Sequence, residues 1–352
     1  MGECVVDGVP LCLAKAKPEP CRVKTEPSRA QPNRKAIIDQ HSAKDSSREL
    51  DGSSKRDSWK LVRMKAGFAL KKSTKTVKCG EYTCRIKHGG ESAAADLTLF
   101  TGRSVEHYQS PPARSPEELW VFHSSEPQWI KAPLQNTWDG LFNYSVTYLH
   151  GSEGAQLTFA KKLLRKANVE SVNFAAFRRQ RKFNALWLVS HCTQKHRPKI
   201  TSARAMYALE LANYIQINVF TTSDSCREQL GALVKNVSKT QDQSMKGYTF
   251  YLAFENSLCE DYITEKLWKV LEAKPYTIPV ALGGLSIEEY RQVAPPNSFI
   301  HVKNFTSPKA LADHLKHVAE NDDAFNYYMQ WRNEYRIIRK GYPSGRNYLF
   351  ML

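Results

Sequence analysis

Three sequence patterns that commonly bind nucleotides, or the metal ions that accompany them, are absent from these 352 residues. No Gly-x-Gly-x-x-Gly follows a predicted strand, which disfavours a dinucleotide-dependent oxidoreductase. No Gly-x-x-x-x-Gly-Lys-Ser/Thr occurs, so the sequence contains no P-loop. Asp-x-Asp, a common ligand pattern for the divalent ion that neutralises a diphosphate, is also missing. A diphosphate site in this chain would therefore depend on lysine and arginine side chains.

The sequence also has no apolar run of about 18 residues, the length that a transmembrane helix needs. As given, it predicts neither a membrane-spanning helix nor a signal peptide. The eight cysteines include no repeated Cys-x-x-Cys pair, which argues against a cluster of zinc sites and favours disulfides for Cys79 and Cys84. An even cysteine count and sequons at Asn143, Asn236 and Asn304 fit the lumen of the secretory pathway.

Positive charge is concentrated near the N-terminus. Residues 1–78 hold 18 Lys and Arg against 9 Asp and Glu, which supplies +9 of the formal net charge of +16. Such a segment could bind nucleic acid, and basicity alone keeps that hypothesis open. However, it has almost no aromatic side chains to stack on bases and no sustained apolar period. We therefore interpret residues 1–78 as a disordered or stem-like basic segment and expect no nucleic-acid partner.

Two α/β units are predicted to follow. The first covers residues 79–184, with strands expected at 97–100, 119–123 and 142–149 and a basic amphipathic helix at 156–167. The second covers residues 185–352, where strands alternate with helices of about ten residues. This alternation predicts right-handed βαβ units and a parallel sheet covered on both faces. Its strands are expected at 185–190, 215–220, 248–254, 277–282 and 298–302, and its helices at 203–213, 226–235, after residue 262, and at 286–293, 308–320 and 324–338.

The stretch from Tyr248 to Trp268 carries the clearest functional signal. Tyr248 to Phe254 has the composition of a strand buried on both faces, and a polar loop and a helix follow it. Such strand-to-helix corners bind ligands in open α/β sheets. Lys266 in the first turn, and Arg204 near the start of the helix that follows the first strand of the same unit, could add their charge to the unpaired N–H groups of the helix starts. The pair predicts an anion site that works without a metal ion.

The amino-acid sequence of this region also resembles that of a known family. The segments FYLAFENSLCEDYITEKLWKVLEA, IPVALGG and APPNSFIHVKNFTSPKALADHL are similar to those of the α-1,3-fucosyltransferases, glycosyltransferase family ten, and most similar to its animal members. The resemblance runs from ALWLVSHC to the WRNEY segment. It continues more loosely through CGEYTC, LWVFHSSEP and LFNYSVTY, and it does not include residues 1–75.

The resemblance implies a GT-B architecture, in which two Rossmann-like domains face each other. Residues 79–184 would be the acceptor-side domain, and residues 185–352, with the C-terminal helices, would bind GDP-β-L-fucose. It implies an inverting transfer of L-fucose to the 3-hydroxyl of N-acetylglucosamine in a glycoprotein or glycolipid glycan. No cofactor would be required, and a divalent ion would be at most stimulatory. By family analogy alone, the protein would be a type II membrane protein facing the Golgi lumen.

The resemblance also implies roles for individual residues. Lys266 and Arg204 would contact the diphosphate, and Glu265 would contact the ribose or the fucose. The donor-binding residues implied together are Ser190, Arg204, Glu255, Asn256, Tyr262, Glu265 and Lys266, with no metal ligand among them.

An inverting transfer needs a general base for the acceptor hydroxyl. The family places that base in a Glu-Ser-Pro-like triplet, which corresponds to Glu126. Here the triplet reads Glu-Pro-Gln, and Pro127 restrains Glu126 to extended backbone geometry. His191 stands where the family usually has Asn. These departures motivate the alternative of a non-catalytic relative that binds GDP-fucose or glycans.

Overall fold

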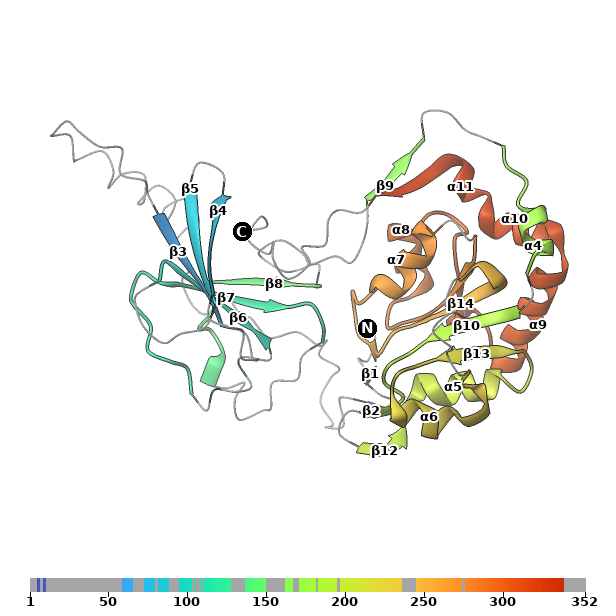
Figure 1. The fold of residues 1–352 in the computed structure, drawn as a ribbon, viewed down its shortest axis with the longest axis horizontal. Coiled ribbons are helices and arrows are strands. Elements are labelled where there is room, and N and C mark those ends of the chain that lie inside the picture. The colour runs from blue at the N-terminus through green and yellow to red at the C-terminus, as the bar shows by residue number, and fades with distance from the viewer. Residues whose placement is uncertain are drawn as a thin grey trace. The chain divides into compact units, whose positions relative to one another are not determined.

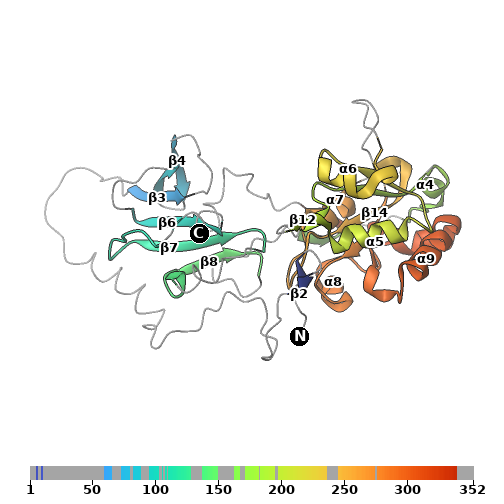
Figure 2. The same cartoon turned by 90° about the horizontal axis from the view of Figure 1, so that it is seen from below.

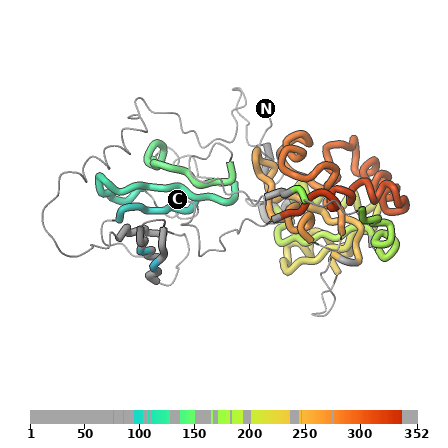
Figure 3. The backbone as a smooth tube through the Cα atoms, turned by 90° about the horizontal axis from the view of Figure 1, so that it is seen from above, coloured from blue at the N-terminus to red at the C-terminus, as the bar shows by residue number. Residues whose placement is uncertain are grey.

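The computed structural model describes a defined part of the chain, drawn in colour in Figure 1. The chain divides into two compact units. One unit comprises Met1–Cys21 and Thr158–Ser344, and the other comprises Arg22–Leu157 and Gly345–Leu352. The backbone of each can be followed as a tube in Figure 3. The described residues are 5–6, 9–10, 59–65, 73–79, 82–88, 95–102, 105, 108, 110–127, 137–149, 162–166, 171–181, 183–194, 197–235, 245–273 and 276–338.

A five-stranded parallel sheet forms the centre of the unit that comprises Met1–Cys21 and Thr158–Ser344, called the first unit below. Its order is β13-β10-β14-β16-β17, so β14 is the middle strand, and all seven of its residues are buried. The aromatic and aliphatic run of β14 suits a strand covered on both faces. The predicted parallel sheet is confirmed. The strands are β13 (Ile217–Phe220), β10 (Phe183–Leu188), β14 (Tyr248–Phe254), β16 (Ile278–Leu282) and β17 (Ile300–His301).

Helices cover both faces of this sheet (Figures 1 and 2). On one face, alternate strand residues such as Trp187 and Phe250 pack with α5, α6, α9 and α10. On the other, Tyr251 and Ala281 belong to the apolar clusters that include α7 and α8. The helices are α4 (Ala175–Arg179), α5 (Ala203–Leu211), α6 (Asp224–Leu230), α7 (Glu265–Glu272), α8 (Ile287–Val293), α9 (Pro308–Glu320), α10 (Asp322–Met329) and α11 (Trp331–Glu334), with short 3₁₀ turns η2 (Gly231–Leu233), η3 (Met245–Gly247) and η4 (Val302–Asn304).

Local signals in the sequence set where several helices begin. The Ser286 hydroxyl accepts from the Glu289 N–H, and the Glu289 carboxylate accepts from the Ser286 N–H, which is a capping box at the start of α8. Helix α9 begins with Pro308 after the capping residue Ser307. These signals satisfy N–H groups that the first helical turn leaves without partners.

Two predicted helices are wrong over the short segments that form a β-ribbon instead. Strand β18 (Tyr335–Ile338) pairs antiparallel with β9 (Lys162–Arg165). The first lies at the end of the helix expected over 324–338, and the second lies inside the helix expected over 156–167. The two segments are more than 150 residues apart in sequence, so the backbone hydrogen bonds between them are a tertiary effect that overrides local helical periodicity.

Three short strands lie apart from the main sheet. β15 (Ser257–Leu258), within the loop that follows β14, pairs with β1 (Val5–Val6), which pairs in turn with β2 (Val9–Pro10). A separate ribbon joins β11 (Thr193–Gln194) to β12 (Arg197–Thr201).

The second unit contains a six-stranded sheet in the order β4-β5-β3-β6-β7-β8. Only β4 runs antiparallel to its neighbour. An aromatic cluster that includes Phe100, Trp120 and Trp138 packs together in this unit. The three strands expected between residues 97 and 149 are confirmed, the last in shortened form. The strands are β3 (Trp59–Lys65), β4 (Ser73–Cys79), β5 (Tyr82–His88), β6 (Leu97–Thr101), β7 (Leu119–Ser124) and β8 (Tyr144–Thr147).

Strands β3 and β4 lie in the segment that the sequence suggested to be disordered or stem-like. Over residues 59–65 and 73–78, and in the short strands β1 and β2, that interpretation is wrong. β3 is hydrogen-bonded to β5 on one side and to β6 on the other. A basic composition predicts poor burial of apolar surface, but it says nothing about backbone pairing with strands that come later in the chain.

Candidate functional site

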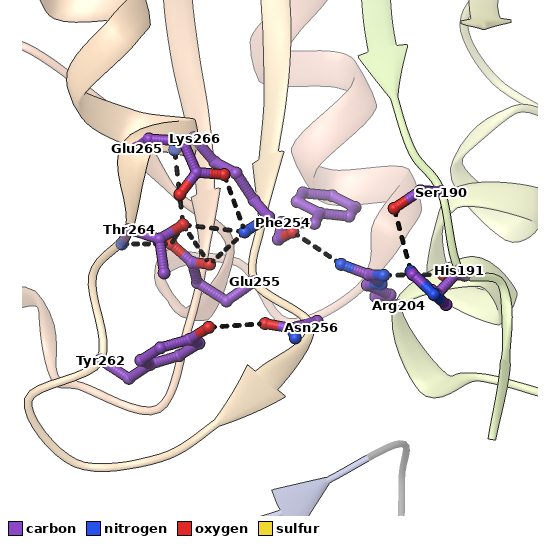
Figure 4. A network of polar contacts seen from close by, with 10 residues as sticks. All are labelled: Ser190, His191, Arg204, Phe254, Glu255, Asn256, Tyr262, Thr264, Glu265 and Lys266. Carbon is purple, nitrogen blue, oxygen red and sulfur yellow. Dashed lines mark hydrogen bonds and ion pairs between the residues drawn. The ribbon is translucent and has the colours of Figure 1, made fainter. Parts of the chain in front are cut away.

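The candidate site lies at the carboxyl edge of the parallel sheet in the first unit (Figure 4). Ser190 and His191 follow β10, and Glu255 and Asn256 follow β14, which is the neighbouring strand. Helices α5 and α7 begin at this same edge. Carboxyl ends of neighbouring parallel strands meet at one edge, which is where open α/β sheets bind ligands. Residues predicted from distant parts of the sequence are thus brought together.

Arg204 connects the two strand ends. It is only 7% exposed, although a lone arginine at a helix start is usually solvated. Its Nη1 donates to the carbonyl oxygen of Phe254 at 3.2 Å, and its Nη2 donates to that of His191 at 2.7 Å. The charge of Arg204 is therefore built into the sheet edge. Because neutral carbonyl oxygens accept these bonds, the positive charge is not cancelled by them.

Ser190 and His191 lie beside Arg204 and are both exposed. The Ser190 hydroxyl is 2.9 Å from Nδ1 of His191. The next residue, Cys192, forms a disulfide with Cys226 on α6. This bond ties the loop after β10 to a helix that covers the sheet. The sequence signals for disulfides, an even cysteine count among them, did not identify this pair.

Glu255 is a buried carboxylate at the end of the central strand. Its backbone N–H extends the strand pairing by donating to the carbonyl oxygen of Leu282 at 2.9 Å. Its Oε1 accepts from the Thr264 N–H at 2.7 Å, and the Thr264 hydroxyl is 2.9 and 2.8 Å from its two oxygens. Burial raises the pKa of Glu255, and the charge of Lys266 and the Thr264 hydrogen bonds oppose that rise.

Lys266 sits in the first turn of α7, whose capping residue is Thr264. Its Nζ lies 3.0 Å from Oε2 of Glu255, 2.8 Å from the Thr264 hydroxyl and 3.5 Å from Oε1 of Glu265. The Lys266 side chain is 21% exposed, whereas that of Glu255 is 1% exposed. Of this ion pair, the lysine side chain is thus the part that reaches solvent.

Asn256 and Tyr262 complete the group drawn in Figure 4. The Tyr262 hydroxyl donates to Oδ1 of Asn256 at 3.0 Å, and the Tyr262 ring is buried. Between them, Asp261 has a left-handed φ of 59°, which reverses the chain before α7. Gly284 packs so closely on this loop that a Cβ there would lie 2.5 Å from the carbonyl oxygen of Cys259. The loop between β14 and α7 is therefore held by the Tyr262–Asn256 hydrogen bond and by its close packing on Gly284.

Glu126 belongs to the other unit. It is exposed and follows the carboxyl end of β7, and its carbonyl oxygen accepts from the Ser124 hydroxyl at 2.5 Å. Its assignment as a base stays a prediction.

Comparison with known proteins identifies the region that carries the cluster. Residues 178–346 match the family described as glycosyltransferase family 10 (fucosyltransferase), C-terminal part. Through this domain the chain belongs to glycosyltransferase family 10. Every residue of the cluster in Figure 4 lies within the family 10 domain, and Glu126 lies outside it.

Curated relatives extend the similarity beyond the family 10 domain. Glycoprotein 3-alpha-L-fucosyltransferase A of Drosophila melanogaster is 27% identical over 279 residues, which is 75% of this chain and 50% of that protein. A 3-galactosyl-N-acetylglucosaminide 4-alpha-L-fucosyltransferase of Bos taurus is 33% identical over 264 residues, 73% of this chain and 66% of that protein. An alpha-(1,3)-fucosyltransferase of Caenorhabditis elegans is 34% identical over 154 residues, 44% of this chain and 32% of that protein. The chain spans about half the length of the two Drosophila relatives it matches.

Membrane-spanning helices and metal-binding clusters are both missing from the described ranges. No helix there is both long enough and apolar enough to span a bilayer. In the same ranges, no three His, Cys, Asp or Glu side chains gather in a way that could hold a metal ion.

Proposed function

We propose that this protein is an inverting α-1,3-fucosyltransferase. It transfers L-fucose from GDP-β-L-fucose to the 3-hydroxyl of N-acetylglucosamine in a glycoprotein or glycolipid glycan. The observation that carries the proposal is the placement of Arg204 and Lys266 at one carboxyl edge of a family 10 domain. The names of the relatives, which are α-1,3- and α-1,4-fucosyltransferases, support the same reaction.

In this proposal the donor diphosphate lies against the starts of α5 and α7. Arg204 and Lys266 supply positive charge, and the helix N-termini add unpaired N–H groups. Charge builds up on the diphosphate as the bond to fucose breaks, so fixed cations there stabilise the transition state more than the ground state. Because side chains supply this charge, no metal cofactor is required. Ser190, Asn256, Tyr262 and Glu265 complete the proposed donor-contacting set, and Glu255 belongs to the donor site through its ion pair with Lys266.

Glu126 is the general base of the proposed reaction. Its carboxylate takes the proton from the acceptor 3-hydroxyl as that oxygen attacks C1 of fucose. The new bond forms on the face opposite the departing GDP, so the anomeric configuration inverts. The proposal therefore includes the GT-B arrangement, in which the unit that bears Glu126 faces the donor-binding unit across the reacting atoms.

The proposed site of action is the Golgi lumen, with the protein as a type II membrane protein by analogy with its family. The disulfide between Cys192 and Cys226 supports a compartment of this kind, because such bonds persist in oxidising surroundings.

The direct test is a donor–acceptor assay with mass-spectrometric identification of the product. The chain is incubated with GDP-fucose and a broad panel of glycans that contain N-acetylglucosamine, and GDP-mannose serves as the control donor. We expect acceptor-dependent release of GDP and a product heavier by one deoxyhexose in 1,3-linkage. Binding of GDP without turnover on any acceptor would support the non-catalytic alternative, which the changes at His191 and Pro127 favour.

A further inference from the structure

Glu255 carries a charge that the proposed reaction does not obviously need. It places an anion within 3.0 Å of Lys266, the cation that the donor diphosphate would use. A carboxylate beside a phosphate site repels the ligand, so its presence there calls for another role. Its contacts in Figure 4 indicate what that is.

The Glu255 carboxylate faces inward from the donor surface. The side chain is 1% exposed, and its described partners are Thr264 and Lys266, both at the start of α7. A carboxylate so enclosed has no surface to offer to a ribose, a phosphate or a sugar. It touches the start of α7 at three points, which are the Thr264 N–H, the Thr264 hydroxyl and Nζ of Lys266.

The hydrogen bonds of Lys266 use two of its three N–H donors. An ammonium group has three N–H donors. One is directed at Oε2 of Glu255 at 3.0 Å and another at the Thr264 hydroxyl at 2.8 Å. The nearest further acceptor is the carboxylate of Glu265 at 3.5 Å, and Glu265 is itself largely exposed. Two partners inside the fold thus fix the ammonium group, and its further contact is the longer ion pair with the exposed Glu265.

We infer that Glu255 is a positioning residue for Lys266. Together with Thr264 it holds the ammonium group at one place so that the third N–H can meet the donor diphosphate, and Glu255 itself does not contact the donor. A flexible lysine would lose side-chain entropy on binding a phosphate, and this arrangement removes that loss before the ligand arrives. Protein kinases use a buried glutamate in the same way, to hold the lysine that contacts ATP phosphates.

The inference rests on the proposed donor site and is tested by ligand binding, which needs no turnover. Calorimetric titrations of the full chain with GDP and with guanosine separate the diphosphate from the nucleoside. In Glu255→Gln, which keeps the size of the side chain, we expect the Kd of GDP to rise about tenfold, as for loss of one charge-assisted hydrogen bond. The Kd of guanosine should stay unchanged. A merely structural role would raise both, and an unchanged Kd for GDP would overturn the inference.

Thr264 and Lys266 provide second readouts if Glu255→Gln folds poorly. Thr264→Val removes the hydroxyl between the carboxylate and the ammonium group and should also weaken GDP alone, whereas Thr264→Ser should restore binding. In a Lys266→Ala background, Glu255→Gln should not weaken GDP binding further, because no ammonium group is left to position. An equal loss in both backgrounds would show that Glu255 acts independently of Lys266.

The matched control is Glu118→Gln in the other unit. Glu118 is also a buried carboxylate, 4% exposed, and accepts a hydrogen bond from the Thr98 hydroxyl. The same chemical change there should leave the Kd values of both ligands unaltered. If the wild-type chain itself bound no GDP, the proposed donor would be wrong. If the wild type bound GDP and Glu255→Gln bound it equally well, only the positioning role would be wrong.

Discussion

Arg204 and Phe254 are joined across fifty residues of sequence by a hydrogen bond of 3.2 Å, from Nη1 to the backbone carbonyl oxygen. The second bond of Arg204, to the carbonyl oxygen of His191, makes the guanidinium a bridge between the ends of β10 and β14. The same side chain that brings positive charge to the candidate site thus also holds the two strand ends together. In the proposed reaction, donor binding and stability are therefore coupled at this residue.

Arg204→Lys tests that coupling. Lysine keeps the charge but cannot reach two carbonyl oxygens in the fork geometry of a guanidinium. We expect the free energy of unfolding to fall by about 1–3 kcal/mol, as for hydrogen bonds to a charged group, and the KM for GDP-fucose to rise. Denaturant unfolding and steady-state kinetics measure the two effects. Arg291→Lys, at an exposed position on α8, is the control and should alter neither.

Lys266→Ala removes the partly buried cation of the corner. It should lower the rate of fucose transfer by about 10²–10³, the usual loss for one group that stabilises transition-state charge. The control is Lys309→Ala, because Lys309 forms a surface ion pair with Asp313 on α9. Equal turnover of Lys266→Ala and the Lys309→Ala control would remove Lys266 from the mechanism.

Glu126→Gln separates donor binding from chemistry. Because Glu126 lies outside the family 10 domain, we expect the Kd of GDP to remain that of the wild type while kcat falls by about 10²–10⁴, the range for loss of a general base. Glu117→Gln, another exposed glutamate of the same unit, controls for the change of charge. A wild-type kcat in Glu126→Gln would show that another group accepts the proton.

Burial of His301 should make the free energy of unfolding depend on pH. It is fully buried at the end of β17, and burial lowers its pKa from 6.5 to about 4. The unfolded chain therefore binds this proton more readily than the folded chain, so the contribution of His301 is complete above pH 6.5 and is lost as the pH falls toward 4. Over that window His301 should account for roughly 3 kcal/mol, at 1.36 kcal/mol per pKa unit.

The variant that isolates this term is His301→Asn. Nδ1 of His301 accepts from the Lys303 N–H at 3.2 Å, and an asparagine oxygen can take over this bond without titrating. Denaturant unfolding at pH 7 and at pH 4.5 should show a smaller loss of stability for the variant than for the wild type. Equal losses would mean that His301 does not titrate over this range.

The parallel sheet and its central strand could be predicted from the sequence because their signals are local. Tyr248 to Phe254 is apolar almost throughout, and the strand is observed over the same residues. The strand and helix expected around residues 277–293 and the helix at 308–320 are also present, the last with its capping serine. Composition and capping act within a few residues, so one sequence is enough to detect them.

The errors arose where distant segments pair. Nothing within Lys162–Arg165 indicates that Tyr335–Ile338 will lie beside it, and nothing in the basic N-terminal composition indicates that β3 will find β5 and β6. The disulfide between Cys192 and Cys226 is of the same kind, because cysteine counting does not identify partners. In each case the partner residue, rather than the segment itself, decides the structure.

The sequence by itself determined the class of fold, the family, and the residue types available for holding an anion, because these follow from periodicity and from motifs that are contiguous. Only the tertiary structure decided which of those residues are buried and which reach solvent. It buried Arg204 between two strand ends and enclosed Glu255 while leaving part of Lys266 exposed. A motif places Glu255 and Lys266 eleven positions apart but does not say which of them reaches solvent. That depends on which atoms the sheet edge and the first turn of α7 cover, and so on the packing of the folded unit.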